Sequence, residues 1–302
     1  LKMDKNKNHI VPRIGLGTYN MNSQESEDMT YAAIKYGYRH IDTAAVYRNE
    51  DGVGRALKRI YENTDLKRSD LTITTKLWPG GLVKVDRVKN NVGAIKSLDK
   101  SLRNLDADYV DLYLIHSPHA KNKRLEQWET LLTQQEQGKV KNIGVSNWGI
   151  NHIEELNDKG YPLPSANQIE IHPWSQKPEL VQYLKENDID IIAYSSLVPL
   201  STWRHKDGEN SLKTDEMYKD GNDLESPFKK MASKYDVTEA QVLLKWALQL
   251  GYAILPKSIQ IDRMQENFDL DFGIDDEDMN LIEQLDRGGS VTWEYGDPLA
   301  TK

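Results

Sequence analysis

Short apolar runs alternate along this chain with segments whose apolar residues recur every three or four positions. Runs of the first kind are typical of buried strands, and the second spacing is typical of helices with one buried face. The pattern predicts eight strands, at residues 14–17, 38–42, 71–76, 110–116, 141–146, 166–170, 189–195 and 253–256.

Helical spacing is clearest in three segments and at one capping box. The apolar stripes of the three segments are Val53, Leu57, Ile60 and Tyr61, then Val88, Val92, Ile95, Leu98, Leu102 and Leu105, then Leu125, Trp128, Leu131 and Leu132. A further helix is expected to begin at Thr238, because Thr238 and Gln241 have the spacing of a capping box.

Eight strand-then-helix units fit a closed barrel better than an open doubly wound sheet, which usually has fewer strands. We therefore expect an α/β protein, a (β/α)8 TIM barrel, with residues 1–302 forming a single domain. Two polar stretches are too long for minimal loops, residues 199–225 and the tail from 286 onward. In a barrel the first of these should lie over the C-terminal face, where loops build active sites.

Composition and charge narrow the class of protein. The chain has 38% hydrophobic and 28% charged residues, which is enough apolar material for a core. Its net charge is −8, which argues against nucleic acid or an anionic membrane as partner. It contains no cysteine, no apolar run of membrane-spanning length and no apolar core near its start, so we expect a cytoplasmic protein. We also expect a monomer or weak dimer.

Polar residues stand at the ends of several predicted strands. They are Asp42, Lys76, His116, Ser146, Asn147 and Gln168, and Tyr47 follows Asp42 in the next loop. In a barrel these strand ends converge on one rim. Each residue also has a structural explanation, such as helix capping by Asp42 or a core position for His116.

Taken together, Asp42, Tyr47, Lys76 and His116 suit proton transfer to an oxygen. A tyrosine has a pKa near ~10, and a neighbouring ammonium can lower a pKa by ~1–3 units. We expect Lys76 to act in this way on Tyr47 and Asp42 to keep Lys76 charged. A neutral His116 would donate a hydrogen bond to a substrate oxygen.

Seven short motifs make this chain resemble the aldo-keto reductases from residue 14 to about residue 286. They are GLGT (15–18), GYRHIDTA (37–44) followed by Tyr47, TK (75–76), DLYLIH (111–116), IGVSN (143–147), NQIE (167–170), and LPKS (255–258) with Arg263, Glu266 and Asn267. The resemblance implies reduction of an aldehyde or ketone by hydride transfer from NADPH. Tyr47 would protonate the carbonyl oxygen, Lys76 and Asp42 would tune Tyr47, and His116 would position the carbonyl.

The resemblance also implies a set of cofactor contacts. Ser146, Asn147 and Gln168 would hold the carboxamide, and Tyr194 would stack on the nicotinamide. Thr18, Ser195 and Leu197 would lie along the cofactor. Lys257, Ser258 and Arg263 would bind the 2′-phosphate, with Glu266 and Asn267 at the adenine end. By chemistry alone, a lysine, a hydroxyl and a guanidinium can bind phosphate, although such a group can equally be a solvated basic turn.

Departures from the common family pattern bear on the substrate. Ser117 follows His116 where many members carry a bulky aromatic residue, and Tyr19 stands where tryptophan is frequent. With Trp78, these residues are the expected substrate pocket, and Ser117 is expected to open it to bulkier carbonyls. The alternative is that Ser117, followed by Pro118, only shapes the chain as it leaves the strand. Val198, Pro199 and Gln260 also depart from the pattern near the cofactor. Trp148, Trp203, Trp293 and Tyr295 are further candidate pocket walls.

Three other functions are alternatives to this one. A dinucleotide-binding glycine fingerprint fails, because no third glycine follows Gly15 and Gly17 at the required place. A metal-dependent hydrolase needs three or more convergent ligands. Of the candidates His40, Asp42, His116 and His119, we expect only Asp42 and His116 on the rim, so no metal is expected. A cofactor-binding barrel that serves as a redox sensor or accessory subunit remains the alternative to an enzyme.

Overall fold

The structure is a computed structural model, and it describes residues 9–83, 85–200, 225–293 and 297–302. Eight parallel strands pair in chain order. They are β1 (Leu16–Gly17), β2 (His40–Asp42), β3 (Thr72–Leu77), β4 (Val110–Ile115), β5 (Val140–Ser146), β6 (Ala166–Glu170), β7 (Asp190–Tyr194) and β8 (Ala253–Ile254).

Backbone contacts between the first and last strands close the sheet. Ile14 forms a parallel bridge with Ile254, and the amides of Gly15 and Gly17 donate to the carbonyls of Ile254 and Pro256 at 2.9 and 3.0 Å. A Cβ on Gly15 would lie 2.5 Å from Nδ1 of the buried His40, so only glycine fits there. The predicted (β/α)8 barrel is confirmed.

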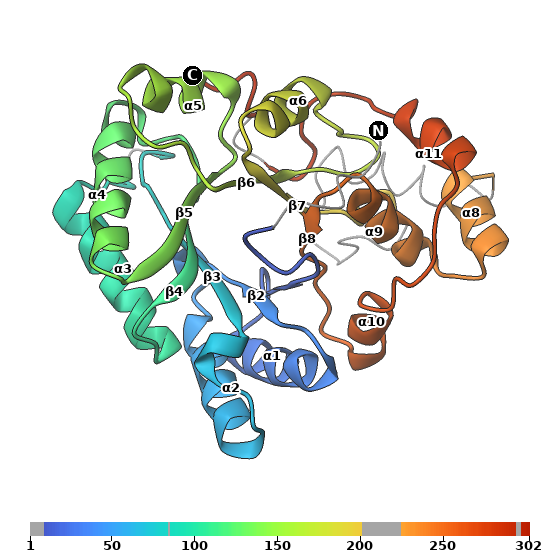
Figure 1. The fold of residues 1–302 in the computed structure, drawn as a ribbon, viewed down its shortest axis with the longest axis horizontal. Helices are drawn as coiled ribbons and strands as arrows, with labels where there is room; N and C mark the ends of the chain where they lie inside the picture. The colour runs from blue at the N-terminus through green and yellow to red at the C-terminus, as the bar shows by residue number, and fades with distance from the viewer. Residues whose placement is uncertain (1–8, 84, 201–224, 294–296) are drawn as a thin grey trace.

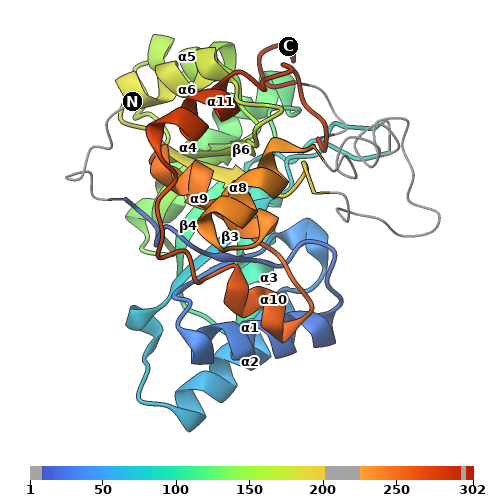
Figure 2. The same cartoon turned by 90° about the vertical axis from the view of Figure 1, so that its right-hand side faces the viewer.

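Helices surround this inner ring of strands (Figure 1). They are α1 (Ser23–Tyr36), α2 (Glu50–Asn63), α3 (Asn91–Leu105), α4 (Arg124–Glu136), α5 (Ile150–Asp158), α6 (Pro178–Glu186), α8 (Pro227–Tyr235), α9 (Glu239–Gln249), α10 (Ile261–Glu266) and α11 (Asp276–Glu283). Short 3₁₀ turns occur at Ala45–Tyr47 (η1), Arg68–Asp70 (η2) and Lys121–Lys123 (η3). The C terminus lies beside α5 in both views (Figures 1 and 2), where Asn151 donates to the carbonyl of Thr301.

Strand and helix positions follow the sequence pattern closely, with one correction. The capping box at Thr238 is present, and the Thr238 hydroxyl accepts from the amide of Gln241. The apolar stripe expected from Val88 is too long, because α3 is capped by Asn90 and begins at Asn91. Val88 lies in the preceding loop and Val92 is 56% exposed, so neither belongs to the buried face.

Two apolar clusters hold the barrel together. The larger fills the space between strands and helices and includes the fully buried Trp128, Trp148 and Trp246. The smaller includes Leu112, Leu114 and Ile192 together with Val11. Because the amide of Ile10 donates to Asp190 at the start of β7, the segment at residues 10–11 lies at the amino ends of the strands. Function is therefore expected at the opposite rim.

Some predicted features lie outside the described residues. These are most of the 199–225 loop, Trp203 and Tyr295. Within the part of the chain that is described, no helix is long and apolar enough to cross a membrane.

Candidate active site

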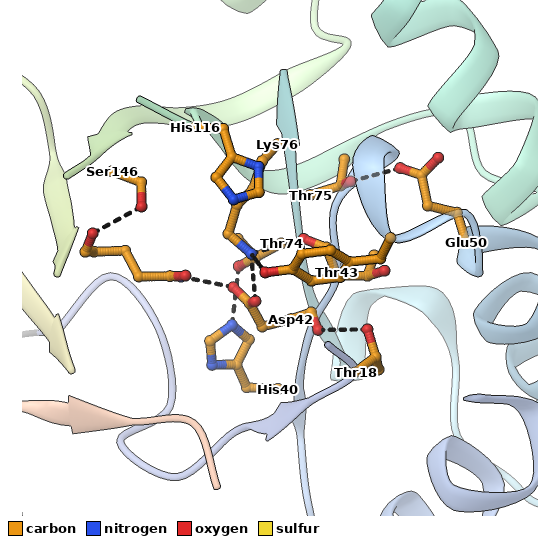
Figure 3. A network of polar contacts seen from close by, with 12 residues as sticks. Thr18, His40, Asp42, Thr43, Glu50, Thr74, Thr75, Lys76, His116 and Ser146 are labelled. Carbon is orange, nitrogen blue, oxygen red and sulfur yellow. Dashed lines mark hydrogen bonds and ion pairs between the residues drawn. The ribbon is translucent and has the colours of Figure 1, made fainter. Parts of the chain in front are cut away.

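A buried lysine is the centre of the polar network at the carboxyl ends of the strands. Lys76 Nζ donates to Asp42 Oδ1 at 2.5 Å and to the carbonyl of Thr43 at 2.9 Å. It also donates to the Tyr47 hydroxyl at 3.3 Å. Figure 3 shows Lys76 and Asp42 meeting at the centre, with His116 above and His40 below in this view.

The local fold explains why these side chains meet. Asp42 ends β2, Lys76 is the penultimate residue of β3, and His116 directly follows β4. Tyr47 ends the turn η1, and the buried Asn49 follows it two residues later. Asn49 donates to the carbonyls of Thr18 and Met21 at 2.8 and 2.9 Å. The four residues lie up to 74 positions apart in the sequence, between Asp42 and His116. The strand ends of the barrel bring them together at one rim.

Burial controls the protonation states at this centre. Burial raises the pKa of Tyr47 and outweighs the opposing charge of Lys76. Lys76 lowers this pKa through its charge and its hydrogen bond, in the expected direction, but the effect of burial is larger and the net pKa lies above the usual value. Burial disfavours the charged form of Lys76, but the charge of Asp42 and the Tyr47 hydroxyl outweigh it and raise its pKa.

His116 is neutral near pH 7. Burial and, to a smaller extent, the charge of Lys76 lower the pKa of His116 well below its usual value. Its Nδ1 has no hydrogen-bond partner among the described residues. A buried polar atom without a partner costs ~1–3 kcal/mol, so a ligand with a polar group would be favoured beside this ring.

A second chain of hydrogen bonds extends from Asp42 across the rim. Gln168 Nε2 donates to Asp42 Oδ2 at 2.7 Å, and the Ser146 hydroxyl donates to the Gln168 carbonyl at 2.8 Å. Asn147 donates to the carbonyl of His116 at 3.1 Å and accepts from the Tyr194 hydroxyl at 2.5 Å. Two of the residues expected at the carboxamide, Gln168 and Asn147, thus bond directly to Asp42 and His116, and Ser146 bonds to both of these two residues.

Other residues expected along the cofactor are placed around the same rim. The buried Thr18 hydroxyl donates to the carbonyl of Asp42 at 3.0 Å. Ser195 is half-buried with φ of 59°, and its hydroxyl accepts from Thr292 at 3.0 Å. Leu197 is half-buried and packs partly against the main apolar cluster.

The expected phosphate residues lie at the last strand-to-helix connection. Lys257 is half-buried, and Arg263 on α10 is exposed. Ser258 departs from the expectation, because its hydroxyl donates to the Gln260 carbonyl at 3.0 Å and accepts the Gln260 amide at 2.9 Å. A phosphate would have to displace this internal bond. Glu266 is exposed on α10, and the buried Asn267 ends that helix.

Aromatic rings surround His116. The rings of Tyr47 and Trp78 meet it edge-on at 5.8 and 5.4 Å. Trp293 stacks on it at 6.2 Å with an interplanar angle of 17°. Tyr19 is 46% exposed and lies edge-on to Tyr47 at 5.2 Å.

Two expected pocket residues are positioned differently from the expectation. Ser117 is fully buried, and its hydroxyl is paired with Nδ1 of His119 at 3.0 Å. It therefore presents neither open volume nor a free hydroxyl in this structure. Trp148 is a core residue with no exposed surface.

One residue at the rim was given no role by the sequence pattern. Glu170, at the end of β6, accepts backbone amides from Val291, Thr292 and Trp293. The available signal was a glutamate at a strand end two positions after Gln168. In the described ranges, no group of three or more potential metal-ligating side chains is present.

The chain is similar to known proteins over most of its length. Residues 13–287 match the model of the aldo/keto reductase family. The chain is 36% identical to methylglyoxal reductase DkgA of Yersinia pestis over 92% of this chain and 90% of that protein. It is 36% identical to the glyoxal reductase of Bacillus subtilis over 93% and 91%.

Solved structures give the same result. An aldo-keto reductase from a deep-sea metagenome library of the Medee basin matches with a TM-score of 0.80 and 33% identity, over 98% of both chains. The Bombyx mori aldo-keto reductase, solved in complex with NADP, matches with a TM-score of 0.78 and 30% identity, over 92% and 90%. The chain belongs to the aldo/keto reductase family and is an oxidoreductase.

Proposed function

We propose that this protein reduces the carbonyl group of an aldehyde or ketone to an alcohol with NADPH, and that Tyr47 is the general acid. One observation carries this proposal. Lys76 Nζ contacts both the Asp42 carboxylate and the Tyr47 hydroxyl, beside a neutral imidazole. Such a group can hold a proton at a phenol until an alkoxide forms.

Each side chain has a distinct part in the proton transfer. The raised pKa of Tyr47 keeps its hydroxyl protonated near neutral pH. As negative charge develops on the carbonyl oxygen, Tyr47 donates its proton, and the adjacent Lys76 stabilises the phenolate that remains. The Asp42 carboxylate keeps Lys76 charged despite its burial. The neutral ring of His116 holds the carbonyl oxygen by a hydrogen bond.

The polar residues at the rim fit a nicotinamide. When bound, reduced nicotinamide would supply the hydride. A primary carboxamide carries both donors and an acceptor, and Ser146, Asn147 and Gln168 offer hydroxyl and amide groups of both kinds within one hydrogen-bonded chain. The ring of Tyr194 is half-buried beside Asn147, where it would stack on the nicotinamide. Thr18, Ser195 and Leu197 would line the rest of the cofactor.

The 2′-phosphate would bind at the basic group formed by Lys257 and Arg263, with Ser258 released from Gln260. Glu266 and Asn267 would lie at the adenine. The names of two relatives favour small dicarbonyl compounds such as glyoxal and methylglyoxal as the first substrates to try. Trp78 and Tyr19 would contact the substrate. Because Ser117 is buried against His119, a preference for bulky carbonyls is not part of this proposal.

A carbonyl panel tests the function. Purified protein is incubated with NADPH and glyoxal, methylglyoxal, aromatic aldehydes, α-keto esters or aldoses, and absorbance reports NADPH consumption. We expect turnover, with kcat/KM highest for the small dicarbonyl compounds. Tight NADPH binding without turnover of any carbonyl would instead support a sensor or accessory subunit.

A further inference from the structure

The carboxylate of Glu170 binds a row of backbone amides from the C-terminal segment. Its Oε1 accepts the amides of Val291 at 2.8 Å and Thr292 at 3.0 Å. Its Oε2 accepts the amides of Thr292 at 3.0 Å and Trp293 at 3.1 Å. One buried strand-end carboxylate therefore binds three consecutive residues that lie more than 120 positions away along the chain.

The surroundings of Glu170 keep it ionised in spite of its burial. Burial favours the protonated acid, but the hydrogen bond from His172 at 2.8 Å, the charge of Lys177 and the Val291 amide lower its pKa to about 2. Charged acceptors bind amides more strongly than neutral ones. The carboxylate of Glu170 is therefore ionised throughout the neutral pH range. We call its hydrogen bonds to the amides of residues 291–293 the anchor.

Further bonds fasten the same segment just upstream. The Ser175 hydroxyl and Lys177 Nζ both donate to the carbonyl of Gly289, at 2.5 and 3.3 Å. The Arg287 amide donates to the carbonyl of Trp174 at 3.1 Å. These contacts bind residues 287 and 289, directly before the segment at residues 291–293 that Glu170 binds.

Trp293, the last residue that the anchor binds, lies in the candidate active site. Its ring stacks on His116, while Tyr47 and Trp78 meet the imidazole edge-on. The segment has a second contact with the rim, because the Thr292 hydroxyl donates to Ser195 at 3.0 Å. A shift of residues 291–293 would uncover one face of His116.

We propose that Glu170 is a positioning residue that sets substrate specificity by holding Trp293 over His116 as a wall of the carbonyl pocket. This inference rests on the proposed function, since it concerns the pocket in which the carbonyl is reduced. Glu170 does not contact the reacting atoms. Its effect passes through three amides to one indole ring, so substrate binding and selectivity should depend on it more than the chemical step does.

The first test is Glu170→Gln, which keeps the shape of the side chain but removes its charge and brings an NH₂ donor against backbone donors. Hydrogen–deuterium exchange of the peptide containing residues 291–293 should accelerate at least tenfold. KM for a small dicarbonyl substrate should rise at least fivefold, with kcat changed less than threefold. Glu154→Gln on α5, which removes the charge of the carboxylate that accepts from the Tyr183 hydroxyl, is the matched control and should change neither quantity.

A double-mutant cycle separates positioning from a general structural role. Trp293→Ala should alter the ratio of kcat/KM between small and bulky carbonyls, and adding Glu170→Gln should change that ratio less than twofold further. Independent, multiplicative effects of the two changes would overturn the proposal. Unchanged exchange at residues 291–293 in Glu170→Gln would overturn it as well.

A second variant keeps the test decisive if Glu170→Gln fails to fold. Thr292→Pro removes the amide that contacts both oxygens of Glu170, together with the hydroxyl that contacts Ser195, and leaves the carboxylate in place. It should reproduce the rise in KM and the faster exchange around residue 293, and wild-type values would refute the anchor. Absence of any carbonyl turnover by the wild type would contradict the proposed function instead, while the exchange experiment would still decide whether Glu170 holds the segment.

Discussion

Lys76 and Asp42 form a fully buried ion pair in which Nζ lies 2.5 Å from Oδ1. Removing one partner of a buried pair leaves an uncompensated charge, which typically costs ~3–5 kcal/mol. In this protein the pair has an additional consequence, because the same Nζ reaches the Tyr47 hydroxyl. The electrostatics of the ion pair and the acidity of the phenol therefore cannot be changed separately.

Lys76→Met should raise the pKa of Tyr47 further, because Lys76 is the main charge that opposes the effect of burial. The phenol then becomes a weaker acid, and kcat for carbonyl reduction should fall by ~10²–10⁴, the usual contribution of general acid–base catalysis. The basic limb of the pH–kcat profile should move to higher pH. Circular dichroism confirms folding of the variant, and an unchanged kcat would exclude Lys76 from the proton transfer.

Lys257→Ala with Arg263→Ala should remove the preference for NADPH over NADH. Each charge-assisted phosphate contact contributes ~1.5–3 kcal/mol before screening, so wild type should bind NADPH about 10- to 1000-fold more tightly. Quenching of protein fluorescence gives both dissociation constants. NADH binding should change little in the variant and serves as the internal control, whereas equal affinities in wild type would argue against a phosphate site here.

Glu170→Gln should destabilise the protein at neutral pH and much less in acid. The folded-state pKa of about 2 lies below the ordinary value of 4.5, so the ionised carboxylate contributes stability that is complete above pH 4.5 and is lost as the pH falls toward 2. The difference of about 2.5 between these two pKa values corresponds to roughly 3–4 kcal/mol at 1.36 kcal/mol per unit. Urea unfolding at pH 7 and pH 3 measures it. A constant difference between wild type and variant at both pH values would show that ionisation of Glu170 does not stabilise the fold.

Much of the site could be predicted because its residues lie at strand ends. Alternating strand and helix signals identify the eight strands, and the geometry of a barrel then brings Asp42, Lys76 and His116 to one rim. Tyr47 can be predicted as part of the site because it lies only five residues after Asp42 in the chain. Ser146 is recognised in the same way, as a polar residue at the end of a buried strand, and Gln168 as a polar residue within the next one.

Other features depend on burial and on distant segments, which a local pattern does not encode. The pKa of Tyr47 is decided by desolvation, and its direction is opposite to that inferred from a neighbouring lysine alone. The stacking of Trp293 on His116 depends on Glu170 and on backbone amides, which carry no sequence signal. Ser117 was expected to face the substrate, but His119, two residues later, takes its hydroxyl.

The central claim is that Tyr47 protonates the carbonyl oxygen, and Tyr47→Phe tests it most directly. The change removes the transferable proton and keeps the ring that contacts His116 and Tyr19. Single-turnover reduction of a small dicarbonyl compound by bound NADPH, measured beside the NADPH dissociation constant, should show a rate lower by ~10²–10⁴ with cofactor affinity within twofold of wild type. A variant that keeps more than a tenth of the wild-type rate would contradict the account.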